Sequence, residues 1–159
     1  MRLTILAALA VFALDQWTKI AVVHWMNLRH LGTIEVLPPW ITFRMAWNYG
    51  VNFGLFADHS PATRWVLVAL ALAVSAWVLW WVRHDQGRAV RLFAGMLVGG
   101  ALGNVVDRIL YGAVADFLNV TCCGIDNPFA FNVADIAIFL GAAGLVLTHR
   151  SQTSGQKSR

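Results

Sequence analysis

Charged side chains are scarce in this chain of 159 residues. Asp, Glu, Lys and Arg together make up 13% of the sequence, whereas hydrophobic residues make up 58%. An ordinary soluble domain carries about 25% charged residues. A water-soluble core with a polar shell is therefore disfavoured. The net charge of +4 does not indicate nucleic-acid binding, because the basic residues form no single stripe along the chain. The composition is typical of a membrane protein.

Cysteine is also scarce. Cys122 and Cys123 are the only two, and they are adjacent. Neighbouring cysteines form only a strained disulfide, and no other Cys or His stands at zinc-ligand spacing from them. We interpret both as loop residues, and no metal site is predicted.

Several common catalytic motifs are missing from the sequence. It has no Gly-x-Ser-x-Gly nucleophile elbow, no His-Glu-x-x-His zinc helix and no phosphate-binding glycine loop. The Asp-Thr/Ser-Gly sequence of soluble aspartic proteases is absent too, and the five histidines are scattered over predicted loops and helix ends. The usual forms of serine, zinc and nucleotide-dependent catalysis are therefore poorly supported.

Long apolar segments dominate what is present. A membrane-spanning helix needs about 20 mostly apolar residues, and four segments qualify, at about 3–23, 65–82, 89–109 and 129–148. The first could be a secretory signal, but apolar character resumes after Asp15 without a small-residue cleavage site. We predict an all-α membrane protein with four transmembrane helices.

The remaining segments are short. Period-two alternation from Trp40 to Met45 predicts strands in an outer region at about 24–64, so a small β-rich extracytoplasmic segment is expected between the first two helices. The stretch 110–128 is predicted as a loop, with Asp126-Asn127-Pro128 starting the fourth helix. Residues 1–150 form one predicted domain, followed by a polar, disordered cytoplasmic tail at 151–159.

The basic residues predict the orientation, because cytoplasmic loops carry an excess of Lys and Arg. With both termini inside, the cytoplasmic set is Arg2, Arg83, Arg88, Arg91, Arg150, Lys157 and Arg159, and the outer set is Arg29, Arg44, Arg64 and Arg108. Lys19 lies within the first helix. We therefore predict that both termini are cytoplasmic.

Polar residues recur near the predicted outer ends of the helices. Asn104-x-x-Asp107 and Asn132-x-x-Asp135 lie on antiparallel helices at similar depth, and residues three apart share a helix face. Asp15 also falls in the outer half of its helix, because it lies about 18 Å from Leu3 at 1.5 Å per residue. Charged groups inside membrane spans are costly and are normally paired or functional. These groups are predicted to converge on one layer.

Small residues predict close helix packing. Gly95, Gly99 and Gly103 are spaced four apart, and Gly141 and Gly144 lie in the fourth segment. Such spacing lets helix backbones approach within a bilayer. A packing role is preferred over a catalytic one.

Two aspartates held close together cannot both ionise cheaply, so one keeps a proton. The ionised partner can then take a proton from water while the protonated one polarises a carbonyl group. Such a site at the membrane face would meet water from outside and an apolar helix from the lipid. This chemistry predicts peptide-bond hydrolysis.

Five motifs in order make the chain resemble the lipoprotein signal peptidases, the bacterial signal peptidase II family. They are Asp15-Gln16-x-Thr18-Lys19, Asn48-x-Gly50-x-x-Phe53-Gly54, Gly99-Gly100-Ala101-x-Gly103-Asn104-x-x-Asp107-Arg108, Val114-x-Asp116-Phe117 and Phe131-Asn132-x-Ala134-Asp135. Together they span roughly residues 15 to 140. Asn52 departs from the small apolar residue usual in the family.

The resemblance implies an intramembrane aspartyl endopeptidase of the bacterial inner membrane, with its active site at the extracytoplasmic face. It implies cleavage of diacylglyceryl-modified prolipoproteins on the amino side of the lipidated cysteine, no metal or organic cofactor, and inhibition by globomycin-like cyclic peptides. The catalytic dyad would be Asp116 and Asp135. Supporting positions would be Asn48, Gly50, Asn104, Asp107, Arg108 and Asn132, with Asp15 more important for stability.

The residues themselves also allow simpler readings. Asp15 and Lys19 are four apart and favour a structural ion pair. Asp107 and Arg108 need not pair, and either could order a neighbouring loop or contact substrate.

A small transporter or proton-relay module is the alternative function, because intramembrane Asp and Asn also line ion paths. Such a module would need polar residues through the whole depth of the membrane, whereas the second helix carries only Ser75 as a polar residue. A scaffold that binds partner helices through its glycines would leave the aspartates unexplained.

Overall fold

The protein is mostly helical in the computed structural model, which describes residues 1–50, 61–84, 87–121 and 127–156. The helices are α1 (Arg2–Lys19) with its π-helical continuation η1 (Ile20–Trp25), α2 (Leu28–Leu31), α3 (Pro61–Val82), α4 (Arg88–Tyr111) and α5 (Val133–Gln156). Among the described residues, three helical segments are long and apolar enough to cross a membrane: Arg2–Trp25, Pro61–Val82 and Arg88–Tyr111. The apolar part of α5, Val133–Thr148, is shorter.

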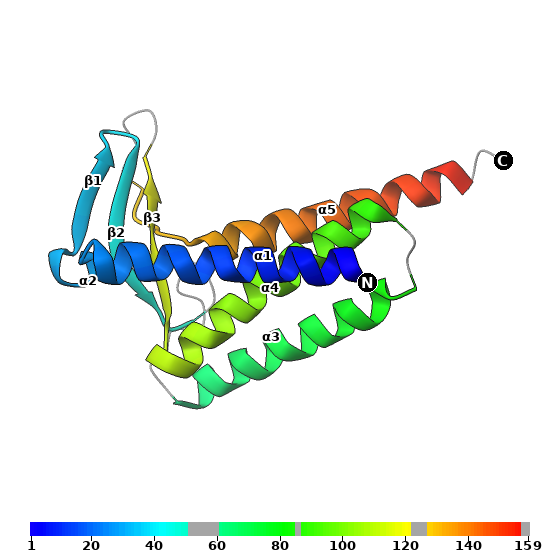
Figure 1. Cartoon of the computed structure of the whole chain (residues 1–159), viewed down its shortest axis with the longest axis horizontal. Helices are drawn as coiled ribbons and strands as arrows, with labels where there is room; N and C mark the ends of the chain where they lie inside the picture. Colours follow the sequence, from blue (N-terminus) through cyan, green and yellow to red (C-terminus); the bar gives the residue numbers. More distant parts are fainter. Residues whose placement is uncertain (51–60, 85–86, 122–126, 157–159) are drawn as a thin grey trace.

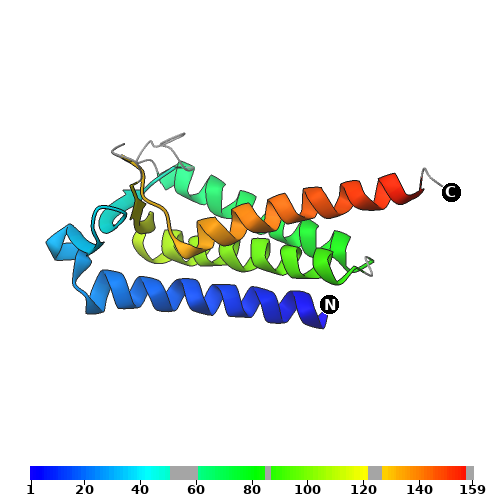
Figure 2. The ribbon, with the colours of Figure 1, turned by 90° about the horizontal axis from the view of Figure 1, so that it is seen from above.

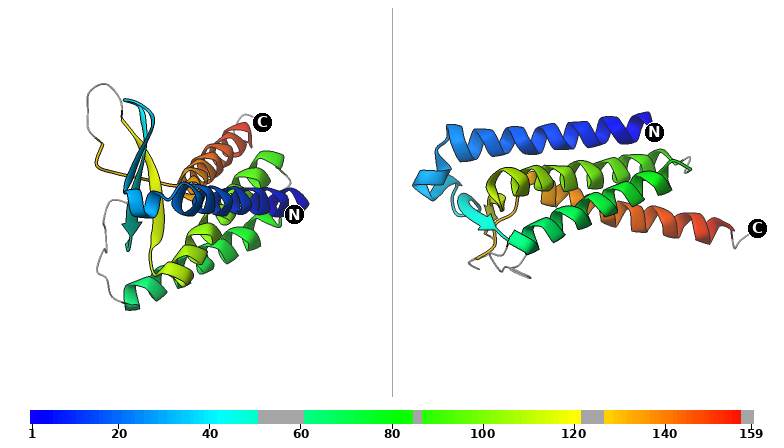
Figure 3. Two further views of the ribbon diagram at one scale, coloured as in Figure 1. Left: turned by 60° about the vertical axis from the view of Figure 1, so that its left-hand side comes forward. Right: turned by 90° about the horizontal axis from the view of Figure 1, so that it is seen from below.

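The long helices lie side by side, and a small sheet stands across one end of them (Figure 1). Helix α4 packs against α1, α3 and α5 and is therefore the central helix. The view from above shows α1 and α5 on opposite sides of α4 (Figure 2). Both termini lie at the end of the bundle away from the sheet (Figures 1 and 3).

The sheet has three antiparallel strands in the order β1-β2-β3. Strands β1 (Thr33–Leu37) and β2 (Ile41–Asn48) fall in the segment where alternation predicted strands. Strand β3 (Val114–Val120) comes from the stretch predicted as a loop, and that prediction was wrong. Alternation is absent there because most of β3 is buried on both faces. The sheet thus combines chain from both sides of α3 and α4.

The fourth apolar helix begins later than the sequence predicted. Helix α5 starts at Val133, whereas the side-chain oxygen Oδ1 of Asn127 accepts a hydrogen bond of 3.0 Å from the backbone N–H of Phe129 in a local turn. Phe131 then pairs with Leu118 of β3 before the helix begins. At its other end α5 continues to Gln156, past the predicted start of the tail, and no proline interrupts it.

Glycines of α4 bring the helices close together, as predicted. A Cβ atom added at Gly95 or Gly99 would collide with the backbone of α1 at Thr4 or Ala8, and one at Gly100 would meet the backbone of Ala134 in α5. The glycines of α5 do the same toward α4, since Gly141 and Gly144 lie against Phe93. The central helix is therefore in close contact with both neighbours along the stretch from Phe93 to Gly100.

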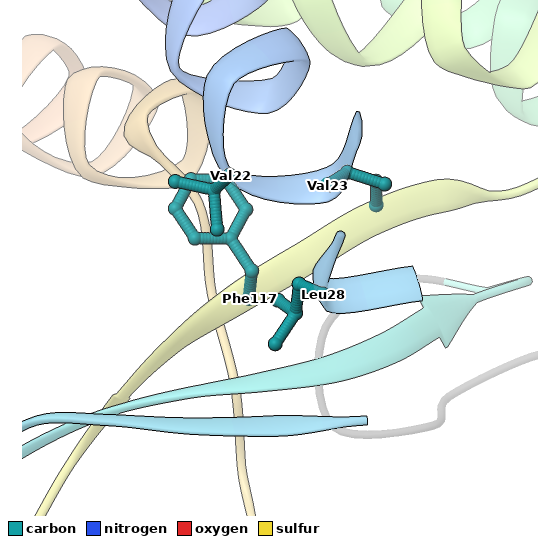
Figure 4. Close-up of a cluster of buried hydrophobic side chains, with 5 residues drawn as sticks. Val22, Val23, Leu28 and Phe117 are labelled. Carbon is teal, nitrogen blue, oxygen red and sulfur yellow. The ribbon is translucent and has the colours of Figure 1, made fainter. Parts of the chain in front are cut away.

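A small hydrophobic cluster joins the sheet to the end of α1. Val22 and Val23 of η1, Leu28 of α2 and Phe117 of β3 are buried against one another (Figure 4). The chain turns out of η1 at Asn27, which has a φ of 58°. Burying each large side chain contributes about 1.5–3 kcal/mol. This cluster fixes β3, and with it Asp116, beneath the helix ends.

Candidate active site

A buried ion-paired cluster links α1 to α4. It consists of Asp15, Lys19 and Asp107: the ammonium Nζ of Lys19 lies 2.8 Å from Oδ2 of Asp15 and 2.8 Å from Oδ2 of Asp107. The ion pair expected between Asp15 and Lys19 is therefore present, and Asp107 joins it. A Cβ atom added at Gly103 would lie 2.5 Å from Oδ2 of Asp15, so a glycine makes room for that carboxylate.

The same carboxylates also hold backbone from other elements. Oδ1 of Asp15 accepts a hydrogen bond of 3.0 Å from the N–H of Ala134 in α5, and Oδ2 of Asp107 accepts one of 3.0 Å from the N–H of Ala115 in β3. Buried carboxylates need such donors because desolvation of the charge is costly. The ion-paired cluster therefore sets the positions of α5 and β3 relative to α1 and α4.

Asn104 connects this cluster to Asp135. Its Oδ1 accepts hydrogen bonds from Nζ of Lys19 at 3.3 Å and from Nδ2 of Asn132 at 3.4 Å. Its Nδ2 donates to Oδ1 of Asp135 at 3.0 Å. The amide group is thus oriented, with oxygen toward the ion-paired cluster and nitrogen toward the half-buried Asp135.

Asn132 is the N-cap of α5 and contacts both candidate catalytic residues. Its Oδ1 accepts from the N–H of Asp135 at 2.9 Å, and Oδ2 of Asp135 accepts from the N–H of Asn132 at 3.2 Å. This reciprocal pairing is a capping box with aspartate in the usual place of glutamate. The Nδ2 of Asn132 also donates to Oδ1 of Asp116 at 2.6 Å. A helix cap therefore bridges the two aspartates.

Asp116 lies on β3 with a side chain held by two amides. Besides Asn132, Nδ2 of Asn48 on β2 donates to its Oδ2 at 3.1 Å. The residue is only 3% exposed. Burial, and after it the negative charge of Asp135, raises the pKa of Asp116 to about 7, against the opposing effect of the hydrogen bonds from Asn48 and Asn132. Asp116 can therefore exchange a proton near neutral pH.

Asn48, Gly50 and Arg108 hold the chain beside this carboxylate. Oδ1 of Asn48 accepts from the N–H of Gly50 at 3.2 Å, and Nη2 of Arg108 donates to the carbonyl of Gly50 at 2.7 Å. Nη1 of Arg108 donates to the carbonyl of Asn104 at 3.4 Å. Arg108 thus links Gly50, just after β2, to Asn104 of α4, which agrees with one of the roles predicted for it. The motif residues Phe53 and Gly54 lie outside the described residues, as do Asn52, Asp126, Cys122 and Cys123.

Convergence of the polar residues on one layer is confirmed. Ion pairs of Lys19 with Asp15 and Asp107, and hydrogen bonds of Asn104 with Lys19, Asn132 and Asp135, connect them. Gln16 had no predicted role of its own, yet its Nε2 donates to Oδ2 of Asp15 at 3.1 Å and to Oδ1 of Asp107 at 3.3 Å. A polar amide next to Asp15 within an apolar segment was the signal that could have identified it.

Two features define what the arrangement can do. Asp116 and Asp135 share Asn132 as a hydrogen-bonding partner and influence each other electrostatically. In the described part of the chain, neither forms an ion pair within 4.0 Å, whereas Asp15 and Asp107 both do. A pair of carboxylates held by neutral amides can keep one proton between them, which is the requirement for acid–base hydrolysis.

Known proteins are similar to this chain in sequence and, for a solved structure, in fold. The chain is 40% identical over 149 residues to the lipoprotein signal peptidase of Methylorubrum extorquens (strain PA1), covering 90% of this chain and 82% of that protein. It is also 40% identical over 158 residues to the lipoprotein signal peptidase of Methylobacterium radiotolerans, covering 99% and 91%. A solved structure described as a bacterial membrane enzyme superposes with a TM-score of 0.82 at 26% identity, covering 98% of this chain and 92% of the other. The family model described as signal peptidase (SPase) II matches residues 7–150, and the chain belongs to that family.

Proposed function

We propose that Asp116 and Asp135 are the catalytic pair of a membrane aspartic endopeptidase that cleaves diacylglyceryl-modified prolipoproteins on the amino side of the lipidated cysteine. The chain is a peptidase of lipoprotein signal peptides by family. The observation that supports the residue assignment is that Asn132 hydrogen-bonds to both Asp116 and Asp135. Within the described residues, neither of these aspartates has a salt-bridge partner.

The chemistry follows from a pair with one proton. The ionised aspartate accepts a proton from water as the water oxygen bonds to the scissile carbonyl carbon, while the protonated aspartate donates a hydrogen bond to the carbonyl oxygen. The tetrahedral intermediate then collapses: the C–N bond breaks, and the leaving nitrogen takes a proton from the pair. The products are a carboxylate on the signal peptide and an amine on the lipidated cysteine. Because the aspartates titrate together, acid and base are assigned to the pair.

Neighbouring groups prepare the site for this reaction. Asn48 and Asn132 donate to separate oxygens of Asp116 and so fix the plane of its carboxyl group. Arg108 and Asn48 both bind the backbone of Gly50, and Asn48 also donates to Asp116, so Gly50 is held near this carboxylate. Groups held in place before the substrate arrives lower the cost of reaching the transition state. We assign Asn48, Gly50, Asn104, Asp107, Arg108 and Asn132 supporting roles.

The arrangement supports a multi-pass protein with α1, α3, α4 and α5 in the cytoplasmic (inner) membrane. Both termini lie at the end of the bundle opposite the sheet (Figure 1), and the excess of Lys and Arg belongs to that end. We therefore place both termini in the cytoplasm and Asp116 and Asp135 at the extracytoplasmic face. There, a signal peptide helix can approach from membrane lipid while water reaches the aspartates from outside. Globomycin-like cyclic peptides should compete for the site.

The test is direct. The purified protein is incubated with one prolipoprotein in lipidated and unlipidated forms, and the new amino terminus is identified by mass spectrometry. Cleavage of the lipidated form alone, with the modified cysteine at the new terminus, is expected. Cleavage of both forms, or at another bond, would contradict the proposed specificity.

A chelator distinguishes this chemistry from metal-assisted hydrolysis. Carboxylate acid–base catalysis should be unchanged after treatment with EDTA and dialysis. Loss of activity that zinc restores would instead assign the reaction to a metalloenzyme.

The alternative of a proton-relay or transport module makes a different prediction. In the structure, the described polar network lies at the sheet end of α1, α4 and α5, whereas the buried polar residue of α3, Ser75, is isolated among apolar residues. A relay needs polar groups throughout the membrane depth. Proton flux across vesicles that contain the protein, at a rate above that of empty vesicles, would favour the alternative.

A further inference from the structure

Lys19 has contacts that extend beyond neutralising charge. The three N–H bonds of its ammonium match three acceptors: Oδ2 of Asp15 and Oδ2 of Asp107, each at 2.8 Å, and Oδ1 of Asn104 at 3.3 Å. Lys19 is 5% exposed. Two carboxylates would be enough partners for a lysine that only neutralises charge. The third contact, to Asn104, therefore points to a further role.

The third contact determines which way the amide of Asn104 points. Oδ1 of Asn104 receives donors from both Lys19 and Asn132, and Nδ2 of Asn104 faces Oδ1 of Asp135. If the amide rotated by 180°, its NH₂ group would face two other donors, and its oxygen would face a carboxylate. An ammonium has no acceptor capacity, so the rotated amide would leave unsatisfied donors. Lys19, together with Asn132 and Asp135, therefore disfavours the rotated state.

We propose that Lys19 is a positioning residue of the hydrolytic reaction, acting through Asn104 to keep an N–H donor on Asp135. This inference rests on the proposed roles of Asp116 and Asp135. It assigns Lys19 a role in catalysis as well as the structural ion pair expected for it. The first helix then contributes to the chemistry without touching the substrate.

Losing Lys19 should therefore change the reaction in two separable ways. Without the N–H donor of Lys19, the oxygen of Asn104 loses one of the two donors that orient it, so the hydrogen bond to Asp135 is held less firmly. Misplacement of a reacting group by about 1 Å costs about 100-fold in rate. Without its charge, the field at the aspartate pair becomes more negative. Within the part of the chain that the structure describes, the charged groups around the pair are Lys19 and Asp15 from α1, Asp107 and Arg108 from α4, and the pair itself on β3 and α5. Fewer positive charges should move the alkaline limb of the pH profile to higher pH.

The experiment compares full-length Lys19→Met, Lys19→Gln and Lys19→Arg with wild type on a lipidated prolipoprotein. The methionine variant removes donor and charge, glutamine restores a donor only, and arginine keeps both. We expect kcat per folded molecule to fall about 100-fold for Lys19→Met and less for Lys19→Gln, with little change in KM. The pH profile of Lys19→Gln should move upward, and that of Lys19→Arg should match wild type.

A control separates positioning from loss of stability. Val78→Ala creates a cavity between α3 and α4, where Val78 is 2% exposed and remote in sequence from the aspartates. It should lower the melting temperature and leave kcat and the pH profile unchanged. If Lys19→Met fails to fold, the kcat and pH profile of Lys19→Gln are compared with those of Val78→Ala instead.

The outcomes separate this inference from the proposed function. Failure of the wild-type protein to cleave the lipidated substrate would overturn the function itself. Wild-type cleavage, together with Lys19→Gln or Lys19→Met having unchanged kcat and an unchanged pH profile per folded molecule, would overturn the positioning role alone.

Discussion

Two groups of aspartates lie a few hydrogen bonds apart in this protein and differ in what surrounds them. Asp15 and Asp107 share the ammonium group of Lys19, whereas among the described residues Asp116 receives amide donors, from Asn48 and Asn132. An ammonium favours the ionised carboxylate strongly. A neutral amide orients a carboxylate and compensates its charge only in part. The first group is suited to holding helices together, and the second to exchanging a proton.

Their positions in the fold differ in the same way. Asp15 and Asp107 are among the most deeply buried side chains, at 0% and 1% exposure, and each binds backbone from another element. Asp135 is half-buried in the first turn of α5. The same residue type in one polar layer thus has a cation as its partner at Asp15 and Asp107 and amide donors at Asp116, and the proposed function assigns chemistry to the second kind of site.

The largest expected effect comes from removing either member of the aspartate pair. Asp116→Asn or Asp135→Asn should lower the rate of prolipoprotein cleavage by roughly 10⁴-fold or more, because the members of a catalytic unit are not independent. Each variant should remain folded and inserted in the membrane. The measurement is single-turnover cleavage of the lipidated substrate, with Glu35→Gln on the exposed strand β1 as a control that should behave as wild type. Wild-type rates in either amide variant would remove the pair from the mechanism.

A substitution in the ion-paired cluster should lower the stability of the protein more than its activity. Asp15→Ala leaves Lys19 with one carboxylate fewer and deprives the N–H of Ala134 of its acceptor. Breaking a buried pair by removing one partner costs about 3–5 kcal/mol. We expect a large fall in the melting temperature in detergent, with more activity per folded molecule than either amide variant of the pair retains. Ser75→Ala is the matched control: within the described residues the Ser75 hydroxyl is buried without a hydrogen-bond partner, so its loss should cost little.

A milder change sharpens the comparison inside the aspartate pair. Asn48→Ala removes one of the two amide donors to Asp116, and a hydrogen bond to a charged group contributes about 1.5 kcal/mol, or about tenfold in rate. Since that bond lowers the pKa of Asp116, its loss should raise this pKa above about 7. The alkaline limb of the activity profile should then move to higher pH. Thr42→Val, on the same strand, should leave the profile in place, and an unmoved limb in Asn48→Ala would show that Asp116 does not set it.

The sequence allowed the polar layer to be predicted better than the sheet. Residues spaced three or four apart must share a helix face, so the meeting of Asn104, Asp107 and Asp135 followed from counting. Strand β3 could not be found this way, because it is buried on both faces and pairs with β2 across about seventy intervening residues. A pairing between two strands so far apart in the chain leaves no pattern in the local sequence. The start of α5 was missed for a related reason.

Asn127-Pro128 is a good helix start by composition, yet Asn132 takes the cap position because Phe131 first pairs with β3. Tertiary pairing thus overrode a local signal. The bridge of Asn132 between Asp116 and Asp135 depends on that later start, because a residue inside the helix would have its amide turned away from the cap geometry. The spacing identified Asn132 and Asp135, but their reciprocal hydrogen bonds needed the structure.

The smallest effect tests whether Asp116 is destabilising when ionised, as the comparison with the ion-paired cluster implies. The pKa of Asp116 is raised from 3.8 in its ordinary state to about 7 in the folded protein, so the folded state binds the proton more tightly than the unfolded state. The stability that this residue contributes is fully present below about pH 4 and is lost as the pH rises to about 7. The wild-type melting temperature should therefore fall between pH 5 and pH 8 more steeply than that of Asp116→Asn, which has no charge to bury.

Asparagine can accept only one of the two hydrogen bonds that Asp116 accepts. The Asp116→Asn variant should therefore be less stable than wild type at pH 5 and match or exceed its stability at pH 8. Parallel pH dependences in the two proteins would mean that Asp116 ionises without cost, and the contrast between the two aspartate groups would then lie in geometry alone.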